Sequence, residues 1–166
     1  CVELVRRSGF REGVYIRPLC YKNELSLGPR LQGVESSFCC YVIKLGDYCD
    51  IETGLDVVVS SWRRLGDNAI PSRAKCTGAY INSSLAATEA RQAGFDEAIF
   101  LREDGTVAER SAMNLFIVMG NKLITSPATA DILVGITRNT VMELAANELG
   151  LDVLERPIAR TELYVC

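Results

Sequence analysis

The 166-residue chain contains no histidine, and this absence removes several kinds of catalytic chemistry. Ser-His-Asp and Cys-His sites both need an imidazole base, and histidine is also a common metal ligand. The seven cysteines include no CxxC pair, so the sequence predicts no metal site. If the chain is an enzyme, lysine, tyrosine, cysteine or carboxylate side chains must move its protons.

Long apolar runs and clustered positive charge are also missing. No run approaches the ~20 residues that cross a membrane, and we expect no membrane span and no signal peptide. The net charge is −3 and the 18 basic residues are scattered, which argues against a nucleic-acid partner. The odd cysteine count favours reduced thiols in a cytoplasmic protein, with a disulfide between Cys39 and Cys40 as the alternative.

The pattern of apolar residues predicts one α/β domain with mixed strands, and a 48% hydrophobic content is ample for its core. Helical spacing over 77–93 and 136–149 predicts two main helices, ended by Gly94 and Gly150. Runs rich in β-branched and aromatic residues predict strands at 14–21, 37–45, 55–60, 97–101, 106–109, 115–118, 123–125 and 153–158.

Lys75 precedes the first predicted helix, and Tyr80 lies five positions later near the same helix face. A lysine amine attacks a carbonyl only when deprotonated, and burial and the positive end of a helix both disfavour its ammonium form. Taken alone, Lys75 also fits an exposed loop lysine like Lys22 and Lys44. Tyr80 alone fits a core aromatic residue.

Gly135-Ile136-Thr137 opens the second helix, where free backbone N–H groups and a hydroxyl suit a phosphate. This kind of helix start is common. Glu109 ends a predicted strand, and a carboxylate in that position can keep a pyridine nitrogen protonated, which makes the ring an electron sink. The alternative is an edge-strand carboxylate that pairs with Arg110. Together with Lys75, these are the parts that hold pyridoxal phosphate.

Three blocks of sequence occur in order along the chain. They are Ala74-Lys75-x-x-Gly78-x-Tyr80-x-x-Ser83-x-Leu85-x-x-x-Glu89-Ala90, Glu109-x-x-x-x-Asn114-Leu115-Phe116 and Leu133-x-Gly135-Ile136-Thr137-Arg138. The combination resembles the fold-type IV pyridoxal-phosphate enzymes, most of all the branched-chain amino-acid aminotransferases. Two further segments are similar to that branch, Tyr15-Ile16-Arg17-Pro18-Leu19 and Val59-Ser60-Ser61-Trp62-x-Arg64.

The resemblance implies a role for each matching residue. Lys75 would be the Schiff-base lysine and the proton shuttle. Tyr80 would bind the cofactor's 3-oxygen and Glu109 its ring nitrogen. The phosphate would be held by the backbone N–H groups of Ile136 and Thr137, with Leu133 against the ring. For the substrate, Tyr15 would approach the α-carboxylate, while Arg17 and Tyr48 would take the distal carboxylate of glutamate or 2-oxoglutarate.

The resemblance also implies a fold. We expect residues 1–166 to form the large, mixed-sheet (pseudo-barrel) α/β cofactor-binding domain, truncated at both ends. Residues 1–20 would include the end of the preceding domain or an interdomain segment. Three positions depart from the family pattern without removing a catalytic group: Cys76-Thr77, Arg110 and Val134.

The implied activity is amino-group exchange between branched-chain L-amino acids (leucine, isoleucine and valine) and 2-oxoglutarate through pyridoxal 5'-phosphate. We expect a cytoplasmic homodimer or higher homo-oligomer with no nucleic-acid or membrane partner. The alternatives that share the cofactor are D-amino-acid aminotransferase, amine transaminase and aminodeoxychorismate lyase. An alternative of another class is a non-catalytic α/β domain that retains the pattern.

Overall fold

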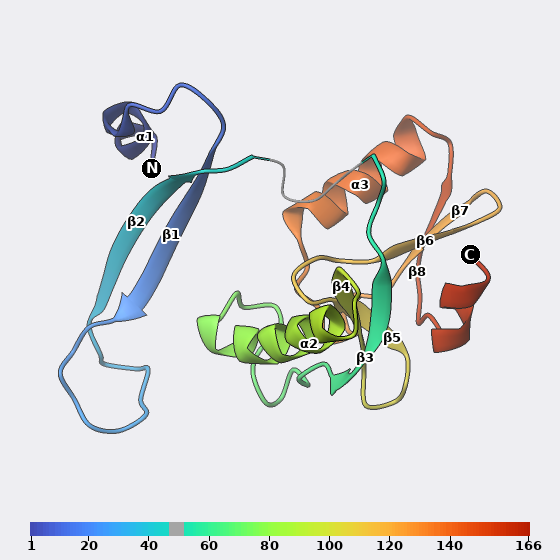
Figure 1. Ribbon diagram of the computed structural model, residues 1–166. Helices are drawn as coiled ribbons and strands as arrows, with labels where there is room; N and C mark the ends of the chain where they lie inside the picture. Colours follow the sequence, from blue (N-terminus) through green and yellow to red (C-terminus); the bar gives the residue numbers. More distant parts are fainter. Residues whose placement is uncertain (47–51) are drawn as a thin grey trace. The chain divides into compact units, whose positions relative to one another are not determined.

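The computed structural model describes residues 1–46 and 52–166. The chain divides into two compact units, Cys1–Thr53 and Gly54–Cys166 (Figure 1). The assignment of residues 1–166 to one cofactor-binding domain, with 1–20 from a preceding segment, stays a prediction.

The first unit is a short helix followed by a β-hairpin. Helix α1 (Val2–Ser8) ends at Gly9, whose φ of 76° lies in the left-handed region that favours glycine. Strands β1 (Val14–Lys22) and β2 (Ser36–Lys44) pair antiparallel along their whole length (Figure 1). The predicted strands over 14–21 and 37–45 are therefore confirmed.

The second unit contains two three-stranded sheets. The strands are β3 (Val57–Arg63), β4 (Glu97–Leu101), β5 (Val107–Arg110), β6 (Phe116–Met119), β7 (Lys122–Thr125) and β8 (Asp152–Glu155). In the first sheet β3 pairs parallel with β4, and β4 pairs antiparallel with β5. In the second sheet β6 pairs antiparallel with β7, and β7 pairs parallel with β8. The predicted mixture of strand directions is confirmed.

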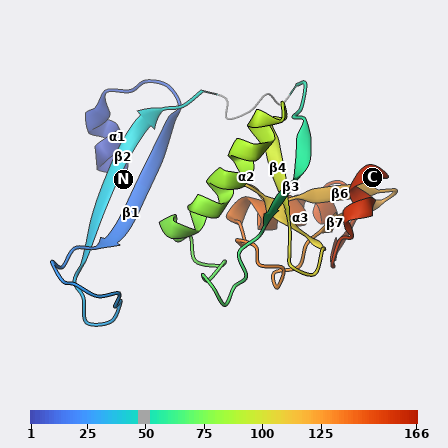
Figure 2. The ribbon, with the colours of Figure 1, turned by 60° about the horizontal axis from the view of Figure 1, so that its bottom comes forward.

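Two main helices accompany these sheets, as the sequence predicts. They are α2 (Tyr80–Gln92), entered through the 3₁₀ turn η1 (Thr77–Ala79), and α3 (Ile136–Asn147). Helix α2 packs beside β3 and β4 (Figure 2). Helix α3 packs against β8. A second 3₁₀ turn, η2 (Arg160–Tyr164), follows β8.

Strand β4 connects the two parts of the core because its side chains alternate between its two faces. Ala98 and Phe100 belong to the cluster that includes the buried alanines of α2. Ile99 and Leu101 belong to the cluster that includes Ile117 and Ile124 of the second sheet. All four of these residues from β4 are buried. Because β4 is covered on both faces, it reads in the sequence as an unbroken apolar run.

Helix α2 buries its small and polar residues rather than its largest apolar ones. Asn82, Ser83 and the alanines of α2 are buried, whereas Ile81 and Leu85 are 69% and 40% exposed. The Asn82 amide donates from Nδ2 to the carbonyl of Arg63 at 3.0 Å and accepts from the Leu65 N–H at 3.3 Å. Helix α2 therefore fixes the chain that leaves β3.

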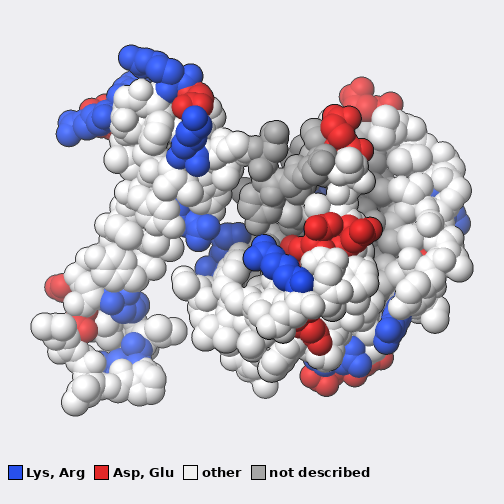
Figure 3. Space-filling model, viewed as in Figure 1, with Lys and Arg blue, Asp and Glu red and all other residues white. Residues whose placement is uncertain are grey.

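The surface of the first unit carries charges of both signs. Lys and Arg side chains gather over the α1 end of this unit, with acidic side chains among them (Figure 3). There Glu3 pairs with Arg6 and Arg7. Within the described residues, none of the helices has both the length and the apolar character needed to cross a membrane.

Candidate active site

One cavity of about 700 Å³ lies in the second unit. Its walls come from the entry to α2, the end of β5 with the turn that follows, and the start of α3. Six of the residues singled out in the sequence line it: Lys75, Tyr80, Glu109, Leu133, Ile136 and Thr137. The structure thus brings together residues from three separate blocks of sequence.

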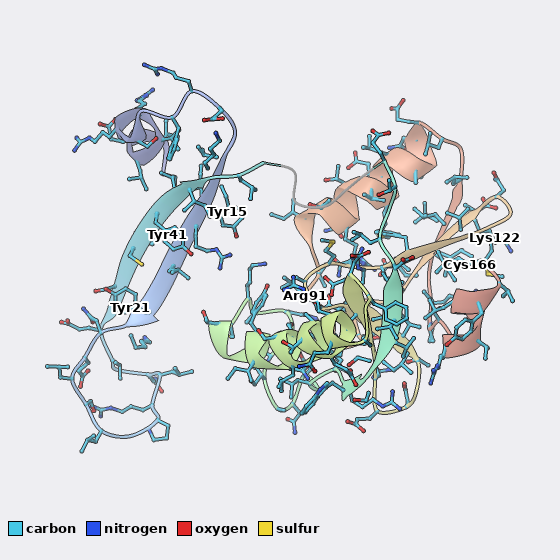
Figure 4. The ribbon with its side chains drawn as sticks, viewed as in Figure 1. Tyr15, Tyr21, Tyr41, Arg91, Lys122 and Cys166 are labelled. Atoms are coloured by element: carbon cyan, nitrogen blue, oxygen red, sulfur yellow. The ribbon has the colours of Figure 1, made fainter. Side chains whose placement is uncertain are left out.

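Lys75 and Tyr80 lie at the entrance to α2. The ammonium nitrogen of Lys75 lies 5.6 Å from the centre of the Tyr80 ring. Lys75 lines the cavity and is exposed rather than buried. The other lysines lie elsewhere, Lys22 and Lys44 on the hairpin of the first unit and Lys122 at the turn between β6 and β7 (Figure 4).

The loop that carries Lys75 is fastened by two aspartates. The Asp67 carboxylate accepts hydrogen bonds from the backbone N–H and the hydroxyl of Ser72, both at 2.8 Å. These bonds lower the pKa of Asp67. The Asp67 N–H donates in turn to Asp131 at 3.0 Å, and Asp131 adopts a left-handed conformation with φ 55°. The chain from Asp67 to Ser72, just before Lys75, is therefore held by a local pair of hydrogen bonds and by one bond to the distant Asp131.

Glu109 is the buried acid of the cavity and is only 5% exposed. Arg64 donates from Nη2 to its Oε1 at 2.8 Å, and Asn114 donates from Nδ2 to its Oε2 at 3.0 Å. The backbone N–H of Leu133 lies 3.2 Å from the same Oε2. Three direct donors therefore converge on one buried carboxylate, and they offset part of the cost of burying its charge.

Burial nevertheless dominates the electrostatics of Glu109 and raises its pKa to about 7. The positive charge of Arg64, the hydrogen bond from Leu133 and the charge of Lys75 act in the opposite direction. A carboxyl group with such a pKa can hold or release a proton near neutrality, which is the range where an acid–base group is most useful.

The interpretation of Glu109 as an edge-strand carboxylate paired with Arg110 is wrong. Neighbouring residues on a strand point to opposite faces, so Arg110 turns away from Glu109. It lies 4.0 Å from Glu97 on the adjacent strand β4 instead. Arg110, which departs from the family pattern, is therefore not the ion-pair partner of Glu109.

Helix α3 begins at the cavity. Gly135 is its N-cap, and a Cβ atom at Gly135 would lie only 2.5 Å from Oδ1 of Asn114. The backbone N–H groups of Ile136 and Thr137, in the first turn, have no carbonyl within the helix to bind. Arg138 anchors this turn from behind, since it is buried and donates to the Ser126 carbonyl at 2.9 Å. Free N–H groups at a helix start suit an anion.

Sequence reasoning gave no role to Arg64 or Asn114, although both stand in the matched patterns. Arg64 follows directly after β3, and its backbone N–H donates to the Leu101 carbonyl at 2.9 Å. Asn114 bridges Glu109 to the Leu133 carbonyl, which it contacts at 2.8 Å. The only sequence signals for them were the positions Trp62-x-Arg64 and Glu109-x-x-x-x-Asn114 within those patterns.

Two of the three residues expected at the substrate, Tyr15 and Arg17, lie in the first unit. Tyr15 and Arg17 share one face of β1, and the Arg17 guanidinium lies 5.0 Å from the centre of the Tyr15 ring. Figure 4 shows Tyr15 and Tyr41 along this hairpin. Tyr48 lies outside the described residues. The roles of all three stay predictions.

The sequence resembles known proteins over its whole length. Residues 1–166 match the family described as amino-transferase class IV. A "Probable branched-chain-amino-acid aminotransferase" of Aquifex aeolicus is 50% identical over 162 residues, which are 98% of this chain and 52% of that protein. The branched-chain-amino-acid aminotransferase of Escherichia coli K12 is 36% identical over 99% of this chain and 54% of its own length.

Solved structures agree with these relatives. The branched-chain aminotransferase of Thermoproteus uzoniensis, crystallised with norvaline, has a TM-score of 0.94 and 44% identity over 99% of this chain and 55% of its own. The enzyme of Thermobaculum terrenum in its PLP form has a TM-score of 0.91 and 37% identity over 98% of this chain and 53% of its own. The expected fold class and resemblance are confirmed. The chain spans about half the length of these relatives, and it belongs to the class IV aminotransferase family.

Proposed function

We propose that this chain is the cofactor-binding part of a pyridoxal-phosphate-dependent branched-chain aminotransferase. The reaction would exchange an amino group between leucine, isoleucine or valine and 2-oxoglutarate. The observation that carries the proposal is the convergence of Lys75, Tyr80 and Glu109 with the start of α3 on one cavity. The names of the relatives support the substrate class.

The residues present fit pyridoxal phosphate. The cofactor needs an amine for its aldehyde, a donor for its phenolic oxygen, an acid for its ring nitrogen and an anion site for its phosphate. Lys75, Tyr80 and Glu109 supply the first three, and the free N–H groups of Ile136 and Thr137 supply the fourth. When bound, the cofactor supplies an electron sink for negative charge at the substrate's α-carbon.

The protein's part in the reaction is to hold groups in place and to move one proton. The Lys75 amine would hold the cofactor and move the proton at the substrate's α-carbon. Glu109 would bind the ring nitrogen and Tyr80 the 3-oxygen. Leu133 would lie against the ring and help to orient it.

The first unit would supply substrate recognition. Tyr15 would approach the α-carboxylate, and Arg17, helped by Tyr48, would hold the distal carboxylate of the dicarboxylic substrates. We further propose that the complete protein is a cytoplasmic homodimer or higher homo-oligomer, with small-molecule substrates as its other partners.

The attachment of the cofactor to Lys75 can be mapped directly. Borohydride reduction of the complete protein with bound pyridoxal phosphate should fix the label on the peptide that contains Lys75, because this is the lysine that lines the cavity among the described residues. Mass spectrometry of the digest identifies the peptide. A label on Lys22, Lys44 or Lys122 instead, or none at all, contradicts the proposed function.

Arg17→Ala should separate the two substrate classes. Only glutamate and 2-oxoglutarate have a second carboxylate, and a charge-assisted hydrogen bond to it contributes about 1.5–3 kcal/mol, or about ten- to a hundredfold. The KM for these two substrates should therefore rise by that factor, while the KM for leucine changes little. Arg30→Ala, which removes an exposed arginine paired with Glu24 in the same unit, is the control. Equal losses for both classes would assign Arg17 to the α-carboxylate or to the fold.

A further inference from the structure

Arg64 is a buried arginine that no motif assignment explains. It is 8% exposed and lines the cavity beside Glu109. We infer that Arg64 is a positioning residue, which holds the Glu109 carboxylate charged and directed at the cofactor's ring nitrogen. The inference rests on the proposed function, and it adds Arg64 as the residue that sets the charge state of Glu109.

The guanidinium of Arg64 is fixed by several contacts. Its Nη2 donates to Glu109 at 2.8 Å, and its Nε donates to the backbone carbonyl of Asp131 at 3.1 Å. The group also lies 5.6 Å from the centre of the fully buried Phe100 ring. Since each of these contacts uses a different part of the guanidinium, the positive charge cannot turn away from Glu109 without breaking another contact.

The backbone around Arg64 is held from both sides. The Arg64 N–H is bonded to Leu101 of β4, and Asn82 of α2 binds the residues before and after it. Glu89 lies about two turns after Asn82 on the same side of α2. It accepts hydrogen bonds from the hydroxyl of Ser60 and the N–H of Ser61 on β3. The polar face that α2 buries therefore serves to place Arg64.

Few other charges face Glu109. From the loop before α2, Lys75 acts on it at longer range. On its own strand, Arg110 is directed to Glu97, and on α3 Arg138 is paired with Glu155. Asn114 and the Leu133 N–H are neutral donors. Arg64 is thus the only positive group in direct contact with Glu109 among the described residues.

Removal of Arg64 would take away the positive charge that favours the ionised form of the buried Glu109. Burial already raises the pKa of Glu109 to about 7 even with Arg64 in place. Without the arginine, Glu109 would stay protonated to higher pH, and a neutral carboxylic acid does not hold a proton on a pyridine nitrogen. Arg64 would then act on the reaction only through Glu109.

The test measures Glu109 in the protein without cofactor. Glutamate labelled with ¹³C at the side-chain carboxyl reports each titration by NMR, and the Glu109 signal is the one missing in Glu109→Gln. In Arg64→Met the titration midpoint should rise by about one to three pH units, the usual effect of one adjacent charge. In Arg64→Lys, which keeps a positive charge, the Glu109 midpoint should stay close to that of the unmodified protein. Arg64→Gln carries the same test if Arg64→Met does not fold.

Arg102→Met is the matched control. Arg102 also binds Asp131, at 2.9 Å through its Nε, but it makes no recorded contact with Glu109. Its loss should leave the Glu109 midpoint unchanged. An unchanged midpoint in Arg64→Met, or an equal rise in Arg102→Met, would overturn the inference and leave Arg64 as a packing residue. Failure of the cofactor to attach at Lys75 would instead contradict the proposed function, because the midpoint is measured without cofactor.

Discussion

Glu109→Gln in the complete protein is expected to slow the half-reaction with leucine by about a hundred- to a thousandfold, while the cofactor stays bound. The amide keeps the shape of the side chain but cannot carry the negative charge that balances a protonated ring nitrogen. The ring then loses much of its capacity to accept electrons from the α-carbon. Stopped-flow absorbance at the cofactor bands measures the rate of this single step.

Glu97→Gln provides a matched control for this prediction. Glu97 is also a partly shielded strand glutamate near an arginine, Arg110, but it does not line the cavity. Its amide variant should react at nearly the rate of the unmodified protein. If Glu109→Gln also reacted at that rate, Glu109 would serve the fold alone, and the cavity would need another partner for the ring nitrogen.

The elements of the fold were largely predictable because their signals are local. The β-branched and aromatic runs of β1 and β2, the apolar run of β4 and the glycine stops after α2 and α3 each depend on a few consecutive residues. The faces of the helices were less predictable. The spacing of Ile81 and Leu85 indicates a helix correctly, but both are exposed, and on α3 Leu144 is exposed while Ala145 is buried.

The candidate site also has a part that local sequence patterns predict and a part that they do not. The motif placed six residues at one cavity, since each block of the pattern carries its own local geometry. It did not indicate which arginine pairs with Glu109. The neighbour Arg110 is closest in sequence, yet the pleat of β5 turns it away, and the actual partner Arg64 comes from the end of a different strand. Such a pairing depends on how β3, β4 and α2 pack, which local patterns do not encode.

The charge state of Glu109 also gives the protein a distinctive dependence of stability on pH. The chain has no histidine, so imidazole groups do not titrate between pH 5 and 8. Burial raises the pKa of Glu109 from 4.5 to about 7 in the folded protein. Between these two values the folded protein binds this proton more tightly than the unfolded chain, so the contribution of Glu109 favours folding below pH 4.5 and is lost as the pH rises through 7.

A shift of about two and a half pKa units at about 1.4 kcal/mol each corresponds to about 3.5 kcal/mol of unfolding free energy. We therefore expect the cofactor-free protein to lose about 2.5 kcal/mol of it between about pH 5 and pH 8. Urea unfolding curves at a series of pH values measure this slope. In Glu109→Gln the slope should nearly vanish over that window, because the amide does not titrate.

Glu162→Gln tests the sign of the effect in the opposite direction. Hydrogen bonds from the Arg156 side chain and the Ala159 N–H lower the pKa of Glu162 to about 2. Glu162 therefore contributes stability above pH 4.5 that is lost only as the pH falls towards 2. Its amide variant should lose this contribution, so that the slope flattens between about pH 2 and 4.5 while the slope between pH 5 and 8 stays the same. A slope between pH 5 and 8 that was unchanged in Glu109→Gln would show that another group titrates there, and that Glu109 does not change its ionisation in the folded protein over this range.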